Sequence, residues 1–372
     1  MHKYRYLNVL LACVLFVKHI NTQLYTWIIN MAPPPAMRRS RKDYLVNLLI
    51  LLGVIVSCFF ILDGFITFFY PIVNLYQYDP SSDYILKANQ TVKFNTKEFK
   101  TIIHTNAYGL RGEEPDFQKE RILVLGDSFT FGQGVNDTQT WPYLLQEQFI
   151  AKQYNFTVLN VGINGYDTRR EYVYLKVHEK DFNPKMIIVT FVINDPLSNS
   201  GEFWSSPIAT GILRYIPSRT ITTLIEYLKD PESFLFKLGI LDYTHSERSI
   251  HVRCLRPQQC VEGWNATFFY MDKLNDYAKQ INSTFIVVNM PLRMQLVQDQ
   301  KFGEYDPQYA SYMLANFTQD RKIVFIDLAN SSLNFSDYYD ADGHWKPSGH
   351  VKAADAIYTI LLEENYTASI FQ

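Results

Sequence analysis

Five short apolar runs beyond residue 120 constrain the fold of this chain most strongly. They read RILVLG, FTVLNVG, MIIVTFVI, FIVVNM and IVFIDL, at residues 121–126, 156–162, 186–193, 285–290 and 323–328. Apolar residues follow one another in each run rather than alternating with polar ones, which is typical of strands in a parallel sheet covered on both faces. Amphipathic stretches lie between the runs, at residues 140–153 and 270–281 for example. This alternation predicts a three-layer α/β/α domain with a parallel sheet of about five strands.

Residues with nucleophile, base and hydrogen-bonding chemistry follow four of the five predicted strands. They are Ser128 after the first strand, Gly165 after the second, Asn194 after the third, and Asp342 and His344 after the fifth. The carboxyl ends of parallel strands meet at one edge of a sheet, where the ligand crevice lies. A turn would explain each residue singly, but together they supply the parts of an esterase.

These blocks give the chain a resemblance to the SGNH (GDSL-type) hydrolase superfamily. The matching blocks are LGDSFTFGQG, the glycine of NVGINGYDT, INDP and DGHWKPSGH, and the upstream NAYGLRGEEP resembles membrane-anchored members. The resemblance covers roughly residues 105–200 and 284–362. It implies a flavodoxin-like hydrolase domain that acts on ester bonds.

The resemblance also implies a role for individual residues. Ser128 would be the nucleophile, His344 would take its proton, and Asp342 would orient the imidazole ring. The oxyanion hole would combine the backbone N–H groups of Ser128 and Gly165 with the side chain of Asn194.

Two positions depart from the superfamily pattern. Val192 occupies the usual glycine position of the third block, and Ala341 stands where the acid of the last block is common, three residues before the histidine. The sequence DGHW also occurs among superfamily relatives, which favours Asp342. A Ser–His dyad supported by a backbone carbonyl is the alternative.

Three further polar residues near these blocks are expected to be structural. We expect His350 to pack at the start of a helix that begins near Pro347, rather than to act as the base. Asp127 and Asp195 are expected to brace their loops through hydrogen bonds to backbone N–H groups.

An uncharged run of 19 residues, 44–62, is long enough for one membrane-spanning helix. The basic cluster RRSRK at residues 38–42 favours the cytoplasmic side, so the chain after residue 70 should lie outside. We therefore predict a cytoplasmic segment at 1–43, a transmembrane anchor at 44–70 and an extracytoplasmic domain at 80–372.

A second apolar run of 11 residues, 7–17, is too short for a span and resembles the core of a signal peptide. The alternative is that translation begins at Met31, which would leave residues 1–30 upstream of the true start.

Two features favour an oxidising, extracytoplasmic compartment. Cys254 and Cys260 bracket a short polar segment and are expected to form a disulfide, with two free thiols as the alternative. Nine Asn-x-Ser/Thr sequons lie after the apolar segment and none before it, so they are candidate glycosylation sites. Their asparagines are Asn89, Asn136, Asn155, Asn265, Asn282, Asn316, Asn330, Asn334 and Asn365.

Residues 197–265 depart from the strand–helix alternation. We interpret them as a lid-like insertion over the strand ends, with a peripheral helical decoration as the alternative.

The net charge of −2 gives no basic footprint for nucleic acid. No histidine or cysteine cluster has the spacing of a metal site, and no dinucleotide or P-loop fingerprint occurs, so we expect no metal and no cofactor.

The leading functional hypothesis is a membrane-anchored serine esterase that hydrolyses O-acyl or O-acetyl esters, with acylated carbohydrate as the expected substrate. The alternatives are an O-acyltransferase that uses the same acyl-enzyme on surface glycans, a lipase or thioesterase, and a non-catalytic carbohydrate-binding protein.

Overall fold

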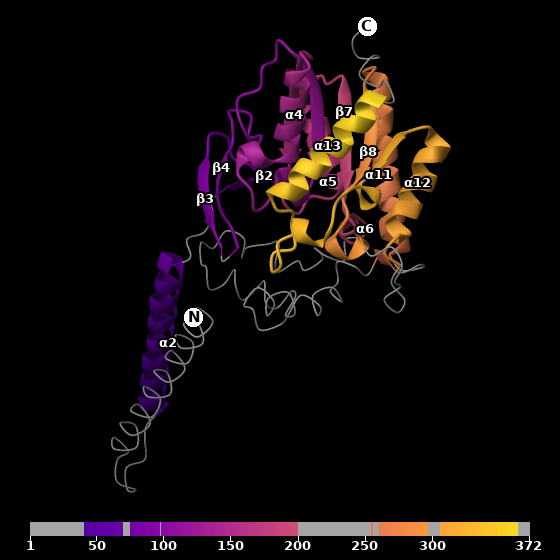
Figure 1. The fold of residues 1–372 in the computed structure, drawn as a ribbon. Helices are drawn as coiled ribbons and strands as arrows, with labels where there is room; N and C mark the ends of the chain where they lie inside the picture. Colours follow the sequence, from indigo (N-terminus) through magenta and orange to yellow (C-terminus); the bar gives the residue numbers. More distant parts are fainter. Residues whose placement is uncertain are drawn as a thin grey trace. The chain divides into compact units, whose positions relative to one another are not determined.

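A five-stranded parallel sheet forms the centre of the domain in the computed structural model (Figure 1). The strands stand in the order β6-β5-β7-β8-β9, and all neighbouring pairs are parallel. They are β5 (Glu120–Gly126), β6 (Phe156–Gly162), β7 (Met186–Phe191), β8 (Thr284–Asn289) and β9 (Val324–Asp327). Each coincides with one of the five apolar runs to within two residues at either end. The predicted parallel sheet of about five strands is confirmed.

The structure describes residues 41–69, 75–96, 98–199, 254–255, 260–296 and 306–363. The predicted signal-like or upstream segment 1–30, most of the predicted insertion 197–265 and the sequon at Asn365 lie outside these residues.

Helices cover both faces of the sheet, which gives the three layers that the sequence predicts. One face packs against α5 (Thr168–Phe182), α11 (Val261–Gln280) and α12 (Tyr309–Arg321), and the other against α4 (Trp141–Ala151) and α13 (Pro347–Glu363). Side chains alternate along β5, so that Leu123 and Leu125 enter the first apolar cluster while Ile122 and Val124 enter the second. Continuous apolar strands are required here because both faces of the sheet are buried.

The order of the strands reverses beside β5. The chain leaves β5 for β6 on one side and then crosses to β7 on the other side. In open α/β sheets the ligand crevice lies at such a reversal, beyond the carboxyl ends of the strands. The loops that follow β5, β6 and β7 are therefore the first place to look for a site.

Two antiparallel hairpins precede the sheet, and the sequence did not predict them. β1 (Tyr76–Asp79) pairs with β2 (Asp83–Leu86), and β3 (Thr91–Asn95) pairs with β4 (Lys100–His104). Each strand has only four or five residues, and most residues of β3 and β4 are exposed. Such short strands leave no continuous apolar run in the sequence.

The chain divides into two compact units, Met1–Phe68 and Phe69–Gln372. The first unit contains all of α2 (Arg41–Phe69) except its last residue. Within α2, the stretch Tyr44–Phe65 has a mean hydropathy of 2.9. By length and composition this helix could cross a membrane, and within the described residues it is the one helix that could.

A disulfide joins Cys254 and Cys260, as predicted. Cys260 stands immediately before α11, and Cys254 is fully buried. The indole N–H of Trp264, on the first turn of α11, donates to the carbonyl of Cys254. The disulfide therefore fixes the chain that leads into α11.

Gly162, at the end of β6, is needed for the close approach of the short helix α3 (Ser128–Phe131). A Cβ atom at this position would lie 2.1 Å from the backbone nitrogen of Phe131 and 2.6 Å from the carbonyl carbon of Thr130. Both are backbone atoms of α3, so the clash could be relieved only by moving that helix.

We predict that Gly162→Ala lowers the free energy of unfolding by about 1–3 kcal/mol, because it overpacks this contact. The measurement is chemical unfolding of the full-length protein in detergent. Ala315→Gly, on the exposed side of α12, is the control and should cost about 1 kcal/mol or less. An unfolding midpoint of Gly162→Ala equal to that of the wild type would contradict the prediction.

Candidate active site

A sharp strand–turn–helix connection presents Ser128 at the carboxyl end of β5. β5 ends at Gly126, and Ser128 is the first residue of α3. The Asp127 carboxylate caps this helix by accepting the backbone N–H of Phe129 at 2.9 Å. Gly132 ends α3 in the left-handed conformation, with φ of 86°. The serine hydroxyl is therefore held, partly exposed, at the edge of the sheet.

Three predicted site residues form one line of hydrogen-bonding contacts. His344 Nε2 lies 2.7 Å from Ser128 Oγ, and His344 Nδ1 lies 2.6 Å from Asp342 Oδ1. An ionised carboxylate can only accept, so Nδ1 carries the proton and Nε2 is free to accept the serine proton. The contact with Asp342 also occupies the nitrogen that would bond a backbone carbonyl in a Ser–His dyad. Asp127 Oδ2 lies farther from Ser128 Oγ, at 3.4 Å.

The electrostatics of the His344–Asp342 pair favour His344 as a strong base. Burial acts to lower the pKa of His344, but the Asp342 carboxylate and its hydrogen bond outweigh burial and raise that pKa above its ordinary value. Burial acts to raise the pKa of Asp342, but His344 and the hydrogen bond from Gln133 bring that pKa below its ordinary value. Asp342 is thus ionised at neutral pH, and its charge stabilises the imidazolium that proton transfer would create.

Aromatic packing orients the imidazole. The ring of Phe129 lies 4.9 Å from the ring of His344 and 5.0 Å from the ring of Trp345, between centroids. Phe129 and Trp345 are both buried. A ring in contact with buried neighbours has few alternative rotamers, so the line from Asp342 to Ser128 is supported by packing as well as by hydrogen bonds.

Gln133 connects the acid to the loop after β6, and sequence reasoning missed it. Its Nε2 donates to Asp342 Oδ2 at 3.0 Å, and its Oε1 accepts from Asn164 Nδ2 at 2.7 Å. Its backbone N–H donates to the carbonyl of Ser128. The signal available in the sequence is its position inside the block FGQG, five residues after the serine.

Gly165 stands in the turn that follows β6, next to Asn164. Its φ of 78° lies in the left-handed region, which glycine adopts without strain. Gln133 holds Asn164 from the side of α3, so the turn is tied to the serine loop. The structure thus places Gly165 in a loop adjoining Ser128, on the crevice side of the sheet.

Asn194, after β7, lies beside Asp127. Its side chain is hydrogen-bonded to the Asp127 carboxyl, and its Oδ1 is buried without a partner among the described residues. Because a carboxylate only accepts, the amide nitrogen of Asn194 faces Asp127. The amide donor is therefore next to the residue that precedes Ser128.

Val192 is part of the hydrophobic core. Its side chain is 2% exposed and belongs to the same apolar cluster as Phe129 and Met290. The valine that replaces the usual glycine of the third block therefore packs into the core below the strand end.

Two further buried carboxyl groups lie near Asp127. Asp195 accepts from the hydroxyl of Thr168 at 2.8 Å, whereas both carboxyl oxygens of Glu171 have no partner among the described residues. Burial, together with the neighbouring acidic groups, raises the pKa of Glu171 and of Asp195 well above their ordinary values. Asp127 and Asp195 thus brace their loops as expected, Asp195 through a hydroxyl rather than a backbone N–H, and Glu171 was not foreseen.

His350 lies on the first turn of α13 and bonds elsewhere than to the serine. It is 1% exposed, and its Nδ1 accepts the backbone N–H of Trp141 at 3.3 Å. Burial lowers its pKa to about 3, so it remains neutral near neutral pH. It is a packing residue, as expected.

Across the described parts of the chain, no group of three or more His, Cys, Asp or Glu residues is arranged to hold a metal ion.

Comparisons with solved structures find matches that are low in sequence identity. The crystal structure of TesA is 13% identical, covers 65% of this chain and 98% of its own, and has a TM-score of 0.41. The psychrotrophic esterase EstA from Pseudoalteromonas sp. is 11% identical, with 66% and 99% covered and a TM-score of 0.41. A two-domain esterase active on acetylated mannans is 14% identical, with 67% and 50% covered and a TM-score of 0.40.

A search of curated proteins found no match. The family comparison is decisive, because the GDSL-like Lipase/Acylhydrolase family matches residues 124–352, which contain every residue of the site described above. The resemblance inferred from the four sequence blocks is confirmed, and the chain belongs to the GDSL-like lipase/acylhydrolase family.

Proposed function

We propose that this chain is a serine esterase that works through an acyl-enzyme on Ser128. The observation that carries the proposal is the line of contacts from Asp342 through His344 to Ser128 Oγ, with separations of 2.6 and 2.7 Å. Family membership supports action on ester bonds. The geometry supports the choice of these three residues from among the polar groups at the strand ends.

The mechanism follows from the protonation states. His344 Nε2 takes the proton of Ser128 as the oxygen forms a bond to the ester carbonyl carbon. The tetrahedral intermediate collapses, the C–O bond to the alcohol breaks, and the imidazolium returns its proton to the alcohol. A water molecule then gives a proton to His344 as its oxygen forms a bond to the acyl carbon. The bond from that carbon to Ser128 Oγ breaks, the imidazolium returns its proton to Oγ, and a carboxylic acid leaves as the second product.

We assign the developing oxyanion to three donors. They are the backbone N–H groups of Ser128 and Gly165 and the side-chain amide of Asn194. Preorganised donors at this place are worth roughly 2.7–4 kcal/mol each in comparable sites. The adjoining positions of the three loops support this assignment, since β5, β6 and β7 are neighbours in the sheet.

We propose that the domain lies outside the cytoplasm on a single membrane anchor. Support comes from the basic cluster before the apolar helix Tyr44–Phe65 and from the disulfide. Seven sequon asparagines are also exposed in the described residues, whereas Asn136 is half-buried. The exposed ones are Asn89, Asn155, Asn265, Asn282, Asn316, Asn330 and Asn334. An endoglycosidase-dependent mobility shift of the native protein tests this orientation, and digestion of the domain by a protease confined to the cytoplasmic side of the membrane contradicts it.

The proposed substrates are O-acyl or O-acetyl esters of carbohydrate, which rests on the superfamily resemblance and on the predicted side of the membrane. Water is the proposed acceptor of the acyl group. An alcohol in the same place would give an acyltransferase by the same chemistry, because the acceptor is selected by the shape and dryness of the crevice.

We expect a fluorophosphonate probe to label the wild-type protein on Ser128. Ser128→Ala should abolish labelling, and Asp342→Asn should slow it by about 10²- to 10⁴-fold because the imidazole loses its orientation and its counter-charge. Ser81→Ala, at an exposed serine in the β1–β2 turn, is the control and should be labelled at the wild-type rate. Folded wild-type protein that resists the probe would instead favour a non-catalytic binding protein.

We expect kcat/KM for an aryl ester to rise with pH as His344 loses its proton. Because Asp342 raises the pKa of His344, the midpoint should lie above about 6.5, the ordinary value for histidine. Asp342→Asn removes that carboxylate, so its midpoint should move to lower pH. His104→Gln removes a comparable His–Asp contact, in which Nδ1 lies 2.6 Å from Asp137 Oδ2, and should leave the midpoint unchanged. A rate that is independent of pH from 5 to 9 would exclude His344 as the base.

A panel of acetylated sugars, aryl esters and acyl lipids, tested on the full-length protein in detergent, defines the reaction. We expect release of acetate from acetylated sugars, dependent on Ser128. Acyl transfer to an added sugar that exceeds hydrolysis would show that the alcohol, rather than water, is the natural acceptor. Preference for acyl lipids over acetylated sugars would refute the proposed substrate class.

A further inference from the structure

Three side chains upstream of the family match bond to three loops of the candidate site. They belong to the hairpin segment, by which we mean residues 75–96 and 98–115, whereas the family match begins at residue 124. The three residues are Tyr84, Glu98 and Arg111. Each meets a different loop, so the segment contacts the site from the outside at three separate points.

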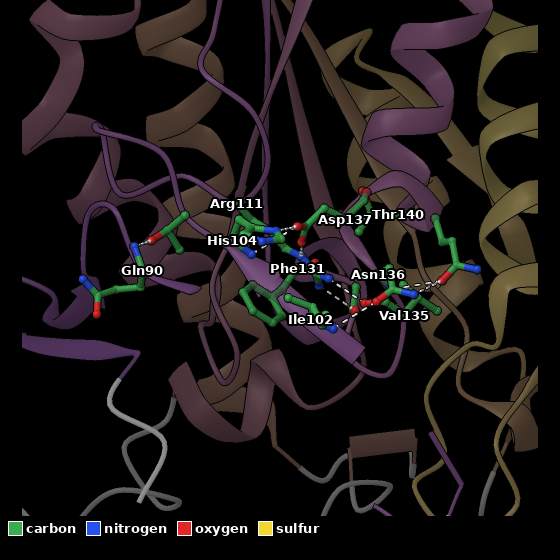
Figure 2. A network of polar contacts seen from close by, with 12 residues as sticks. Gln90, Ile102, His104, Arg111, Phe131, Val135, Asn136, Asp137 and Thr140 are labelled. Carbon is green, nitrogen blue, oxygen red and sulfur yellow. Dashed lines mark hydrogen bonds and ion pairs between the residues drawn. The ribbon is translucent and has the colours of Figure 1, made fainter. Parts of the chain in front are cut away.

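Arg111 holds the loop that follows the serine. Its side chain is fully buried, and its guanidinium donates to the carbonyls of Phe131, Gly132 and Val135 at 2.5–2.6 Å (Figure 2). Its Nε donates to Asp137 Oδ1 at 2.9 Å, which supplies the opposite charge. Planar guanidinium is suited to several acceptors at once, whereas a lysine is not. One side chain therefore fixes the path of residues 131–135, which include Gln133.

Tyr84, from β2, holds the turn that follows β6. Its hydroxyl donates to the carbonyl of Asn164 at 2.8 Å. The carbonyl of Tyr84 in turn accepts the hydroxyl of Tyr166, and the two rings pack edge to face at 5.5 Å. The residues on both sides of Gly165 are thus attached to the hairpin segment, Asn164 through its backbone carbonyl and Tyr166 through its side chain.

Glu98, between β3 and β4, holds the loop that carries the acid. Its carboxylate accepts the backbone N–H of Ala341 at 3.0 Å and that of Asp342 at 2.7 Å. The neighbouring Phe99 is buried and packs on Tyr339 with ring centroids 5.1 Å apart. Glu98 is separated from Asp342 by 244 positions in the sequence.

The backbone of the acid loop needs such an anchor because it turns tightly. Gly343, between the acid and the histidine, has φ of 81° in the left-handed region. The N–H of Tyr339 donates to the carbonyl of His344, and the N–H of Gly343 donates to the carbonyl of Tyr339. These bonds leave the N–H groups of Ala341 and Asp342 to be satisfied from outside the loop, and Glu98 satisfies both.

We propose that three side chains of the hairpin segment, those of Tyr84, Glu98 and Arg111, support the active site, and that Glu98 is a positioning residue that holds Asp342 against His344. The Glu98 side chain is long enough to place its carboxylate oxygens on the backbone N–H groups of Ala341 and Asp342. It touches none of the reacting atoms. This inference rests on the proposed esterase function, since positioning has a catalytic meaning only if His344 is the base.

A pair of variants distinguishes the effect of the length of the Glu98 side chain from the effect of its charge. Glu98→Gln keeps the length of the side chain and one carbonyl acceptor but loses the charge, whereas Glu98→Asp keeps the charge and is one methylene shorter. Glu114→Asp is the matched control, because Glu114 lies in the same segment and also accepts a backbone N–H, but that of Ala107 in its own segment, at 2.6 Å, rather than one from a loop of the site. All variants are made in the full-length protein and studied in detergent.

Four measurements are made on each variant. The rate of Ser128 labelling by a fluorophosphonate is followed from pH 5 to 9, kcat and KM are measured for an aryl acetate, and the thermal midpoint is recorded. The fourth readout is the proton resonance of His344 Nδ1–H in protein with ¹⁵N-labelled histidine. This resonance reports the contact with Asp342 and does not depend on turnover.

We expect Glu98→Asp to lower kcat and the labelling rate by about tenfold or more, since small misplacements of catalytic groups are costly. Its KM should be unchanged, its pH midpoint should fall as Asp342 withdraws from His344, and its Nδ1–H resonance should shift or broaden. Glu98→Gln should stay within about threefold of the wild type. Glu114→Asp should match the wild type in every readout other than the thermal midpoint.

Several results would overturn the inference. One is a Glu98→Asp protein with the wild-type rate and resonance, and another is a larger loss in Glu98→Gln than in Glu98→Asp, which would assign the effect to charge. An equal loss in Glu114→Asp would reduce Glu98 to a general stabiliser of the segment. If wild-type Ser128 is not labelled at all, the esterase proposal fails, and the His344 resonance still decides whether Glu98 holds Asp342.

Discussion

The short contact between Ser128 Oγ and His344 Nε2 joins two loops that are 216 positions apart in the sequence. Neither loop could hold this geometry alone, because Ser128 follows a sharp turn after β5 and His344 lies in the long connection between β9 and α13. The parallel sheet makes the contact possible, since it brings the carboxyl ends of all five strands to one edge. The buried strands supply rigidity, and the loops between them supply the chemistry.

Buried polar groups around the contact are arranged to satisfy one another. Asp342 accepts from His344 and from Gln133, and buried Arg111 is neutralised by Asp137 while it donates to three carbonyls. Satisfied networks of this kind stiffen a site, whereas an unpaired buried group costs free energy. Exceptions include Glu171 and Asn194. Both carboxyl oxygens of Glu171 and the Oδ1 of Asn194 have no partner among the described residues, and burial favours the uncharged form of Glu171.

The sequence was sufficient for the sheet, and it singled out Ser128, His344 and Asp342, which the structure brings into contact. Continuous apolar runs mark buried parallel strands directly, so all five were predicted within two residues. The hairpins between Tyr76 and His104 were missed because their strands have only four or five residues. Exposed and less exposed residues alternate along β3 and β4, so these strands contain no continuous apolar run. Gln133 and Glu98 were missed for a different reason. Their importance lies in which distant atoms their side chains reach, and no local pattern in a sequence encodes that.

The hairpin segment has a consequence for where the functional domain begins. A chain that started at residue 124 would keep Ser128, Asp342 and His344, but it would lose Arg111 and Glu98. The carbonyls of residues 131, 132 and 135 would then lack their buried donor, and Asp137 would lack its counter-charge. The family match marks the part of the chain that carries the reacting groups. The physical unit that holds those groups in place begins at the first hairpin, near Tyr76, because the bonds that fix the three loops originate there.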